Sequence, residues 1–380
     1  MGPITILDTS AFQALSAREH FFVFKHLMSN TTPVLVYEVL SDLSQQVATG
    51  ASLPERVVTL ARKFGASGGP VNASYLILAQ ADLLGGTVPM TGQILPDNSV
   101  AAARMMTADL SPLTHTIMRW CTGEFSESEE EVSRLWRSHT RSLSYSGLND
   151  LLNRNRLTLP QPSSEEAVTA VADDLLARLP LQDVWASWAI EQFVDTGEHA
   201  ELAARRWSRS PRAFFSDHAP YTYHCLRCVL SLVIAVRHGF LAKKPTHMVD
   251  LQYLYYLPFC HVLVSDDRVH RLLTPQLLRD DQTFVQGKDL KASLVAVADE
   301  WEALPVEQQR RRSYALDGYP PPVEPPVLHE LWVEHMMPWT GRRPSGNMDV
   351  DLSESDMELA MAEARQVMNV SAEVSEGSTE

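Results

Sequence analysis

The chain is 380 residues long, with 45% hydrophobic residues and a formal net charge of −15. This length and apolar content allow two or three domains, or one domain with a large insertion. The acidic balance argues against a protein that coats nucleic acid nonspecifically, but not against an enzyme that holds nucleic acid through metal ions.

The negative charge is concentrated at the C-terminal end. From residue 344 onward there are nine acidic residues and one arginine, a net charge of −8, which leaves −7 for the rest of the chain. The four cysteines do not have the spacing of a disulfide framework, which indicates a reducing compartment. The most apolar run, residues 229–236, is too short to span a bilayer. We therefore expect a cytoplasmic protein without a membrane partner.

The N-terminal part of the chain predicts strands that alternate with helices. Residues 4–7 are apolar and mostly β-branched, typical of a buried strand, and this strand ends at Asp8. Residues 11–28 have apolar positions at helical spacing. Residues 34–36 suit a second strand, and residues 38–45 suit the helix after it.

The pattern is helical through most of residues 50–240 and changes again near residue 245. The stretch PTHMVDLQYLYYLPFCHVLVSDDRVHRLL predicts an aromatic helix, a break at Pro258 and a strand over residues 261–264. This strand ends at Ser265-Asp266-Asp267. Residues 283–287 suit one more strand, and a helix follows it.

These elements predict an α/β fold. We expect a three-layer α/β/α core with a mostly parallel sheet, interrupted by a large α-helical insertion. The predicted core is discontinuous and comprises residues 1–48 and 241–340. The insertion is residues 49–240, and residues 341–380 are an acidic, flexible tail.

Acidic side chains follow two of the predicted strands. Asp8 ends the first strand, and Asp267 lies just after the strand over residues 261–264. Because the carboxyl ends of parallel strands share one edge of a sheet, these acids should meet there. Asp250 precedes the second of these strands. Gathered carboxylates repel one another, and a hard divalent cation is the usual reason to bring them together.

The order of these motifs resembles the PIN-domain fold, whose members are mostly metal-dependent ribonucleases. The family's first motif, a strand running into Asp-Thr/Ser-Ser, matches Leu7-Asp8-Thr9-Ser10. Its second, an acid before a leucine after the second strand, matches Asp42-Leu43, with Glu38 one helical turn earlier. Its third, an aspartate that opens a helix, matches Asp250, and its fourth, a strand into Thr/Ser-x-Asp, matches Ser265-Asp266-Asp267.

The resemblance covers residues 1–48 and 241–300, and the stretch DLQYLYYLPFCHVLVSDD looks like a PIN-like branch found in bacterial proteins. The chain departs from the family in length, because roughly 200 residues separate the second and third motifs. It also departs in the second acid, for which Asp42 is the family match and Glu38 is a supporting or replacement ligand.

The resemblance implies a metal-dependent phosphodiester hydrolase, a nuclease that acts on single-stranded RNA. Mg²⁺ or Mn²⁺ would be the cofactor, held by Asp8, Asp250 and Asp267. The implied catalytic acids are Asp8, Asp42, Asp250 and Asp267. The implied supporting residues are Glu38, Asp266, Thr9 and Ser265. The products would carry a 5′-phosphate and a 3′-hydroxyl.

Residues 203–215 combine arginines with aromatic side chains, as single-stranded nucleic acid sites do. The candidate nucleic-acid-binding residues are Arg205, Arg206, Arg209 and Arg212. The alternative is a basic helix face whose aromatic residues belong to the core.

Two other functions remain open. A PIN-like scaffold without turnover would serve as a binding or assembly module, with the insertion or the acidic tail contacting a protein partner. A phosphatase that forms an aspartyl-phosphate would need a second acid two residues after Asp8, where the chain has Ser10. Asp8 could also be a simple N-cap of the following helix.

Overall fold

The structure is a computed structural model. It describes residues 2–49, 55–67, 70–96, 112–142, 146–194, 197–210, 214–309 and 319–336. The predicted acidic tail, residues 341–380, lies outside these ranges. Most described residues belong to one compact unit, formed by Met1–Ala303 with Gly318–Met337.

The sheet of this unit has four parallel strands. The strands are β1 (Ile4–Leu7), β2 (Met28–Ser29), β3 (Val262–Val264) and β4 (Thr283–Val285), in the spatial order β2-β1-β3-β4. The residues of β3 are completely buried, and Ile6 and Leu7 of β1 are buried beside them. Burial on both faces explains why β3 is a continuous apolar run and does not alternate with polar residues.

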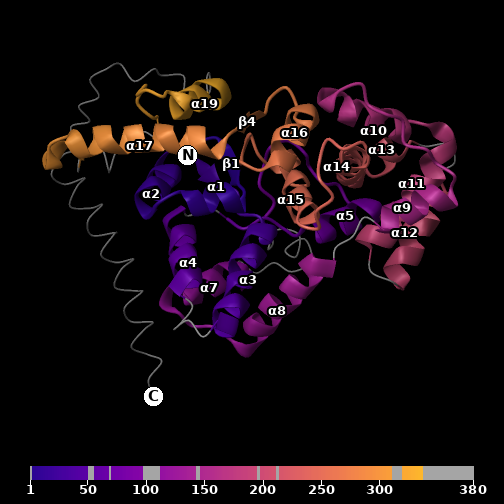
Figure 1. The fold of residues 1–380 in the computed structure, drawn as a ribbon, viewed down its shortest axis with the longest axis horizontal. Helices are drawn as coiled ribbons and strands as arrows, with labels where there is room; N and C mark the ends of the chain where they lie inside the picture. Colours follow the sequence, from indigo (N-terminus) through magenta and orange to yellow (C-terminus); the bar gives the residue numbers. More distant parts are fainter. Residues whose placement is uncertain are drawn as a thin grey trace. The chain divides into compact units, whose positions relative to one another are not determined.

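The first and last thirds of the chain supply the helices nearest the sheet. These helices are α1 (Thr9–Ala14), α2 (Ala17–His26), α3 (Pro33–Thr49), α15 (His247–Leu254), η3 (Leu257–Phe259), α16 (Arg268–Leu277), α17 (Gly287–Ala303) and α19 (Val327–Met336). Helices α1, α2 and α17 pack together, and α19 packs on α17. Segments from opposite ends of the chain, such as α1 and α17, lie side by side (Figure 1).

The middle of the chain is helical, as predicted. Its helices are α4 (Glu55–Ser67), α5 (Tyr75–Leu83), α7 (Pro112–Thr122), α8 (Glu127–Ser142), α9 (Ser146–Arg154), η1 (Glu165–Ala167), α10 (Val168–Leu176), η2 (Leu179–Leu181), α11 (Gln182–Phe193), α12 (Glu198–Ser208), α13 (Phe215–His218) and α14 (Pro220–Arg237). These helices belong to the same compact unit as the sheet. Helix α8 packs on α3, and α14 packs on α15 and α16.

The strands predicted at residues 4–7, 261–264 and 283–287 are confirmed within two residues. The strand predicted over residues 34–36 is wrong, because α3 already begins at Pro33. Proline suits the first turn of a helix, and the apolar positions of 34–43 then form the buried face of α3. The second strand is instead the two-residue β2, which is too short to have a sequence pattern.

The single helix predicted over residues 11–28 is also wrong. It is two helices, α1 and α2, separated by Leu15 and Ser16. Ser16 is the N-cap of α2 and accepts a hydrogen bond from the backbone N–H of Glu19, and the Glu19 carboxylate accepts one from the Ser16 N–H. This reciprocal capping box favours a new helix start at Ser16 over continuation of α1.

Among the residues that the structure describes, no helix combines the length and the apolar composition needed to cross a membrane.

Replacing Ser16 with Ala should lower the free energy of unfolding by about 1 kcal/mol, because the first turn of α2 loses its cap. Urea denaturation of the full chain measures this change. Ser138→Ala, at an exposed position inside α8, is the matched control and should change stability by no more than about 0.5 kcal/mol. Equal effects of the two substitutions would contradict the capping argument.

Candidate functional site

The candidate site lies where the order of the strands reverses. The chain runs from β1 to β2 on one side of β1, while β3 lies on the other side. Asp8 follows β1 directly, and its backbone N–H donates to the Val264 carbonyl at the end of β3. The acids after β1 and β3 therefore share the carboxyl edge at the switch point, where open α/β sheets place their sites.

Asp8 is almost completely buried, with 1% of its surface exposed. It caps α1 by accepting a hydrogen bond from the Ala11 N–H at 2.8 Å, so the predicted capping role is confirmed. The Ser10 hydroxyl donates to both carboxylate oxygens, at 2.9 and 3.0 Å, and the Ser265 hydroxyl donates to Oδ2. Capping thus accounts for only part of what surrounds this carboxylate.

His270, on the first turn of α16, is the charge partner of Asp8. Its Nδ1 lies 3.3 Å from Asp8 Oδ2 and 2.7 Å from the Ser265 hydroxyl. Its Nε2 donates to the backbone carbonyl of Asp250 at 2.7 Å. The single proton of Ser265 goes to Asp8, so Ser265 accepts from His270 Nδ1–H, and both ring nitrogens carry protons.

The charges of this pair support each other. Burial alone would raise the pKa of Asp8, but the hydrogen bond and positive charge of His270, with bonds from Asp267 and Ser265, lower it. Burial favours neutral His270, but its hydrogen bond with Asp8 and the charges of Asp8 and Asp250 raise the pKa of His270 to about 9. The centre therefore holds a carboxylate and an imidazolium cation that are both out of contact with solvent.

Asp267 approaches this pair from the start of α16. It occupies the N-cap position of α16, but its side chain makes no capping hydrogen bond. Burial, its hydrogen bond with Asp8, and the negative charges of Asp8 and Asp250 raise the pKa of Asp267 to about 7. Ligand atoms of Asp8, Asp267 and His270 all lie within 4.8 Å of one another.

Glu38 lies beside this group, at the centre of a second hydrogen-bond network. Its Oε2 accepts hydrogen bonds from the Thr9 hydroxyl and, at 2.5 Å, from the Tyr253 hydroxyl. The Tyr253 ring meets the His270 imidazole edge-on, with centroids 5.8 Å apart. The two hydrogen bonds lower the pKa of Glu38, but burial and the negative charges of Asp250 and Asp8 have the larger effect and raise it to about 7.

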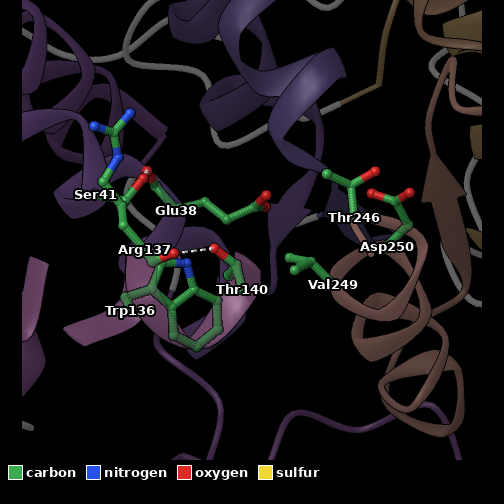
Figure 2. A pocket seen from close by; sticks show the side chains of 8 residues that line it. All are labelled: Glu38, Ser41, Trp136, Arg137, Thr140, Thr246, Val249 and Asp250. Atoms are coloured by element: carbon green, nitrogen blue, oxygen red, sulfur yellow. Dashed lines mark hydrogen bonds between the residues drawn. The ribbon is translucent and has the colours of Figure 1, made fainter. Parts of the chain in front are cut away.

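A pocket of about 250 Å³ adjoins Glu38, between α3, α8 and α15. Figure 2 shows the carboxylates of Glu38 and Asp250 on opposite sides of this pocket, with Trp136 and Thr140 below Glu38 and Val249 below the gap. Asp250 lies on the first turn of α15, three residues after its start, and its Oδ2 is 3.3 Å from His247 Nδ1. Asp250 is not part of the group that lies within 4.8 Å.

The other predicted acids are Asp42 and Asp266. Asp42 belongs to α3, but its side chain lies outside what the structure describes. Asp266 Oδ1 accepts a hydrogen bond from the Lys288 N–H at 3.3 Å, at the start of α17. Thr9 contacts Glu38, and Ser265 contacts Asp8 and His270, so both hydroxyls fix carboxylates.

The predicted arginines lie on α12 or just after it. Arg206 donates to the carbonyls of Asp82, Leu83 and His218, so its guanidinium ties α12 to α5 and α13. Arg205 is exposed and pairs with Glu201. Arg209 is exposed, and Arg212 lies outside the described residues.

Sequence reasoning assigned no role in the site to His270 or to Tyr253. His270 comes three residues after Asp267 and Tyr253 three residues after Asp250, so each pair lies on one helix face. An Asp-x-x-His spacing directly after an acid-tipped strand was the available signal for His270.

Asp8, Asp267 and His270 fit a divalent cation in their donor chemistry. Two carboxylates and one imidazole suit Mn²⁺ and related ions better than Mg²⁺, which prefers oxygen ligands. His270 would bind through Nδ1, because Nε2 donates to a backbone carbonyl, the usual way to orient a metal-ligating histidine. The raised pKa of Asp267 also indicates negative charge that a cation would balance.

Comparison of the chain with protein-family models, with curated proteins and with solved structures finds no match.

Replacing His270 with Gln in metal-free protein should lower the free energy of unfolding by about 3–5 kcal/mol, because Asp8 becomes a buried charge without a partner. Asp8→Asn alone should also be destabilising. The double variant should lose less than the sum of the two, since neither unpaired charge remains. Urea denaturation in EDTA measures all three.

His199→Gln, on α12, is the control and should change stability by no more than about 0.5 kcal/mol. Additive losses in the double variant would contradict a buried ion pair between Asp8 and His270.

Proposed function

We propose that this protein is a metal-dependent phosphodiester hydrolase, a nuclease that acts on single-stranded RNA. The observation that carries the proposal is the group formed by Asp8, Asp267 and His270 at the switch point of a parallel sheet. The four-stranded parallel sheet supports the finer proposal of a PIN-like core with three α/β/α layers. All four cysteines are free, which is compatible with the proposed cytoplasmic setting.

The side chains of the site have distinct roles in this proposal. Asp8, Asp267 and His270 Nδ1 would hold Mn²⁺ or Mg²⁺, and Ser265 would orient the Asp8 carboxylate. When bound, the ion supplies a water of lowered pKa and offsets the charge that develops on the phosphoryl group. Binding requires His270 Nδ1 to lose its proton, because the imidazole is a ligand only in its neutral form.

Glu38 and Asp250 would act from the pocket beside this centre. Glu38 lines the pocket, and Thr9 and Tyr253 both bond its Oε2, which leaves Oε1 to accept a proton or a hydrogen bond. Asp42 keeps its proposed place as the family's second acid. Of the predicted arginines, Arg205 and Arg209 are exposed and could contact the RNA backbone.

A specific observation favours a second candidate, a scaffold without turnover. The Asp8 carboxylate is 1% exposed, its oxygens already accept from Ser10, Ala11 and Ser265, and it forms an ion pair with His270. His270, a cation inside the protein, therefore already balances the negative charge of Asp8, as a bound metal ion would. A protein partner would then contact the helical insertion or the acidic tail.

Adding Mn²⁺ to EDTA-treated protein should raise the free energy of unfolding by about 2.7 kcal/mol at a free concentration of ~100 Kd. The same protein should cleave labelled single-stranded RNA, with Mn²⁺ more effective than Mg²⁺. Asp267→Asn should abolish the stabilisation and reduce cleavage at least about 100-fold, because even supporting residues of metal sites have effects of that order. Thermal unfolding and gel-resolved cleavage are the measurements.

Asp280→Asn, at an exposed acid after α16, is the matched control and should leave both properties unchanged. Labelled single-stranded DNA, tested in parallel, checks the choice of RNA. If neither ion stabilises the protein and neither substrate is cut, the scaffold replaces the nuclease.

A further inference from the structure

Several of the groups that line the pocket between α3, α8 and α15 are hydrogen-bond acceptors. The Ser41 hydroxyl donates to the Glu38 carbonyl at 2.7 Å, and the Thr140 hydroxyl donates to the Arg137 carbonyl at 3.1 Å. Their protons are therefore committed to the helix backbones, and their oxygens can accept only. The carboxylates of Glu38 and Asp250 add further acceptors on opposite sides of the gap (Figure 2).

Glu38 presents an unused acceptor to this space. Both hydrogen bonds to its carboxylate, from Thr9 and Tyr253, fall on Oε2. Oε1 has no hydrogen-bond partner among the described residues, and the carboxylate points into the gap (Figure 2). The two bonds on Oε2 hold the group in one orientation, so its free acceptor is preorganised for a ligand.

An aromatic surface lies beside these acceptors. Trp136 lines the pocket and stacks on Tyr37, with ring centroids 5.1 Å apart and planes at 26°. The stacked pair is a rigid platform, and indole rings bind flat aromatic groups such as unstacked nucleobases. The Arg137 side chain extends toward Ser41, away from the gap between Glu38 and Asp250 (Figure 2).

We infer that this pocket binds a guanine base of single-stranded RNA beside the proposed cleavage site. Guanine is the RNA base whose Watson–Crick edge presents two adjacent N–H donors, N1–H and the N2 amino group, and the two lone pairs of Glu38 Oε1 can accept both. The Thr246 hydroxyl, which lies beside Asp250 (Figure 2), can donate to O6. The inference rests on the proposed function, because it names the base that the same site selects.

The charge of the lining determines which part of a nucleotide enters. Glu38 and Asp250 repel phosphate groups, so the ribose-phosphate backbone would lie away from the gap between them, on the side of Arg137 (Figure 2). Burial and nearby negative charges raise the pKa of Glu38 to about 7. Hydrogen bonds from the N–H donors of the base would lower this pKa again and so favour the charged carboxylate. Uracil has acceptors on both sides of its single N–H, and adenine and cytosine each present an acceptor beside their amino group. Each of these three bases would therefore place one of its acceptors against the Glu38 oxygen, with no hydrogen between them.

The test measures binding of labelled RNA to the full chain in EDTA by fluorescence anisotropy. The four RNAs are nine nucleotides long: one is all U, and the other three carry a single G, A or C at the centre of the U tract. The G-containing RNA should bind about tenfold more tightly than the others. Guanosine should displace it, and adenosine should not. Equal affinity for all four RNAs would overturn the inference. Arginine amide, whose guanidinium also presents paired N–H donors, is the competing ligand. Displacement of the bound RNA by arginine amide but not by guanosine would likewise overturn the inference.

Variants separate the two elements of recognition. Glu38→Gln replaces one acceptor with a donor and should abolish the preference for G. Trp136→Ala should weaken binding of every RNA about tenfold, and Trp136→Phe, which keeps an aromatic ring and the fold, should restore most of it. Leu135→Ala, at the exposed neighbouring position on α8, is the control and should bind as wild type. An undiminished preference for G in Glu38→Gln would overturn the assignment of the base edge to Glu38.

Cleavage in Mn²⁺ distinguishes the failure of this inference from the failure of the proposed function. Cleavage concentrated next to G supports both. Cleavage without base preference overturns the guanine pocket and leaves the nuclease. Selective binding of G without cleavage by any ion supports the pocket and overturns the nuclease.

Discussion

The structure around the sheet edge depends on one buried charge, the carboxylate of Asp8. A carboxylate with 1% of its surface exposed is stable only if its charge and its hydrogen-bonding capacity are both satisfied. The surrounding chain does this with the Ala11 N–H, the hydroxyls of Ser10 and Ser265, and the imidazolium of His270. Helix α1, the end of β3 and helix α16 are therefore held together by contacts with one carboxylate group, that of Asp8.

The other acids of the site have no comparable partner. Asp267 and Glu38 lie close enough to Asp8 and Asp250 for their pKa values to rise to about 7, chiefly through burial. The fully paired carboxylate of Asp8 thus lies beside Asp267 and Glu38, whose charged forms a cation or a hydrogen-bond donor would stabilise. Structures that exist only for stability rarely gather unpaired acids in this way, whereas catalytic and binding sites commonly do.

The helical middle of the chain contributes directly to this region. Helix α8, inside the predicted insertion, packs on α3 of the predicted core. Its residues Trp136 and Thr140 line the same pocket as Glu38 and Asp250. The pocket exists because segments separated by about one hundred residues or more in sequence meet beside the sheet. Residues of α8 therefore form part of the wall of the pocket beside these acids.

The sequence by itself determined the local features with a strong physical pattern. Buried parallel strands are short runs of mostly apolar residues, so β1, β3 and β4 could be predicted, and so could the acids that follow β1 and β3. Two-residue β2 has no period to detect, and Pro33 was compatible with either a strand or a helix start. Only the tertiary structure decided that His270, and not Asp250, completes the group with Asp8 and Asp267. The reason is geometric: a side chain's place in a site depends on how α15 and α16 pack beside the sheet, and the sequence pattern within each helix does not contain that packing.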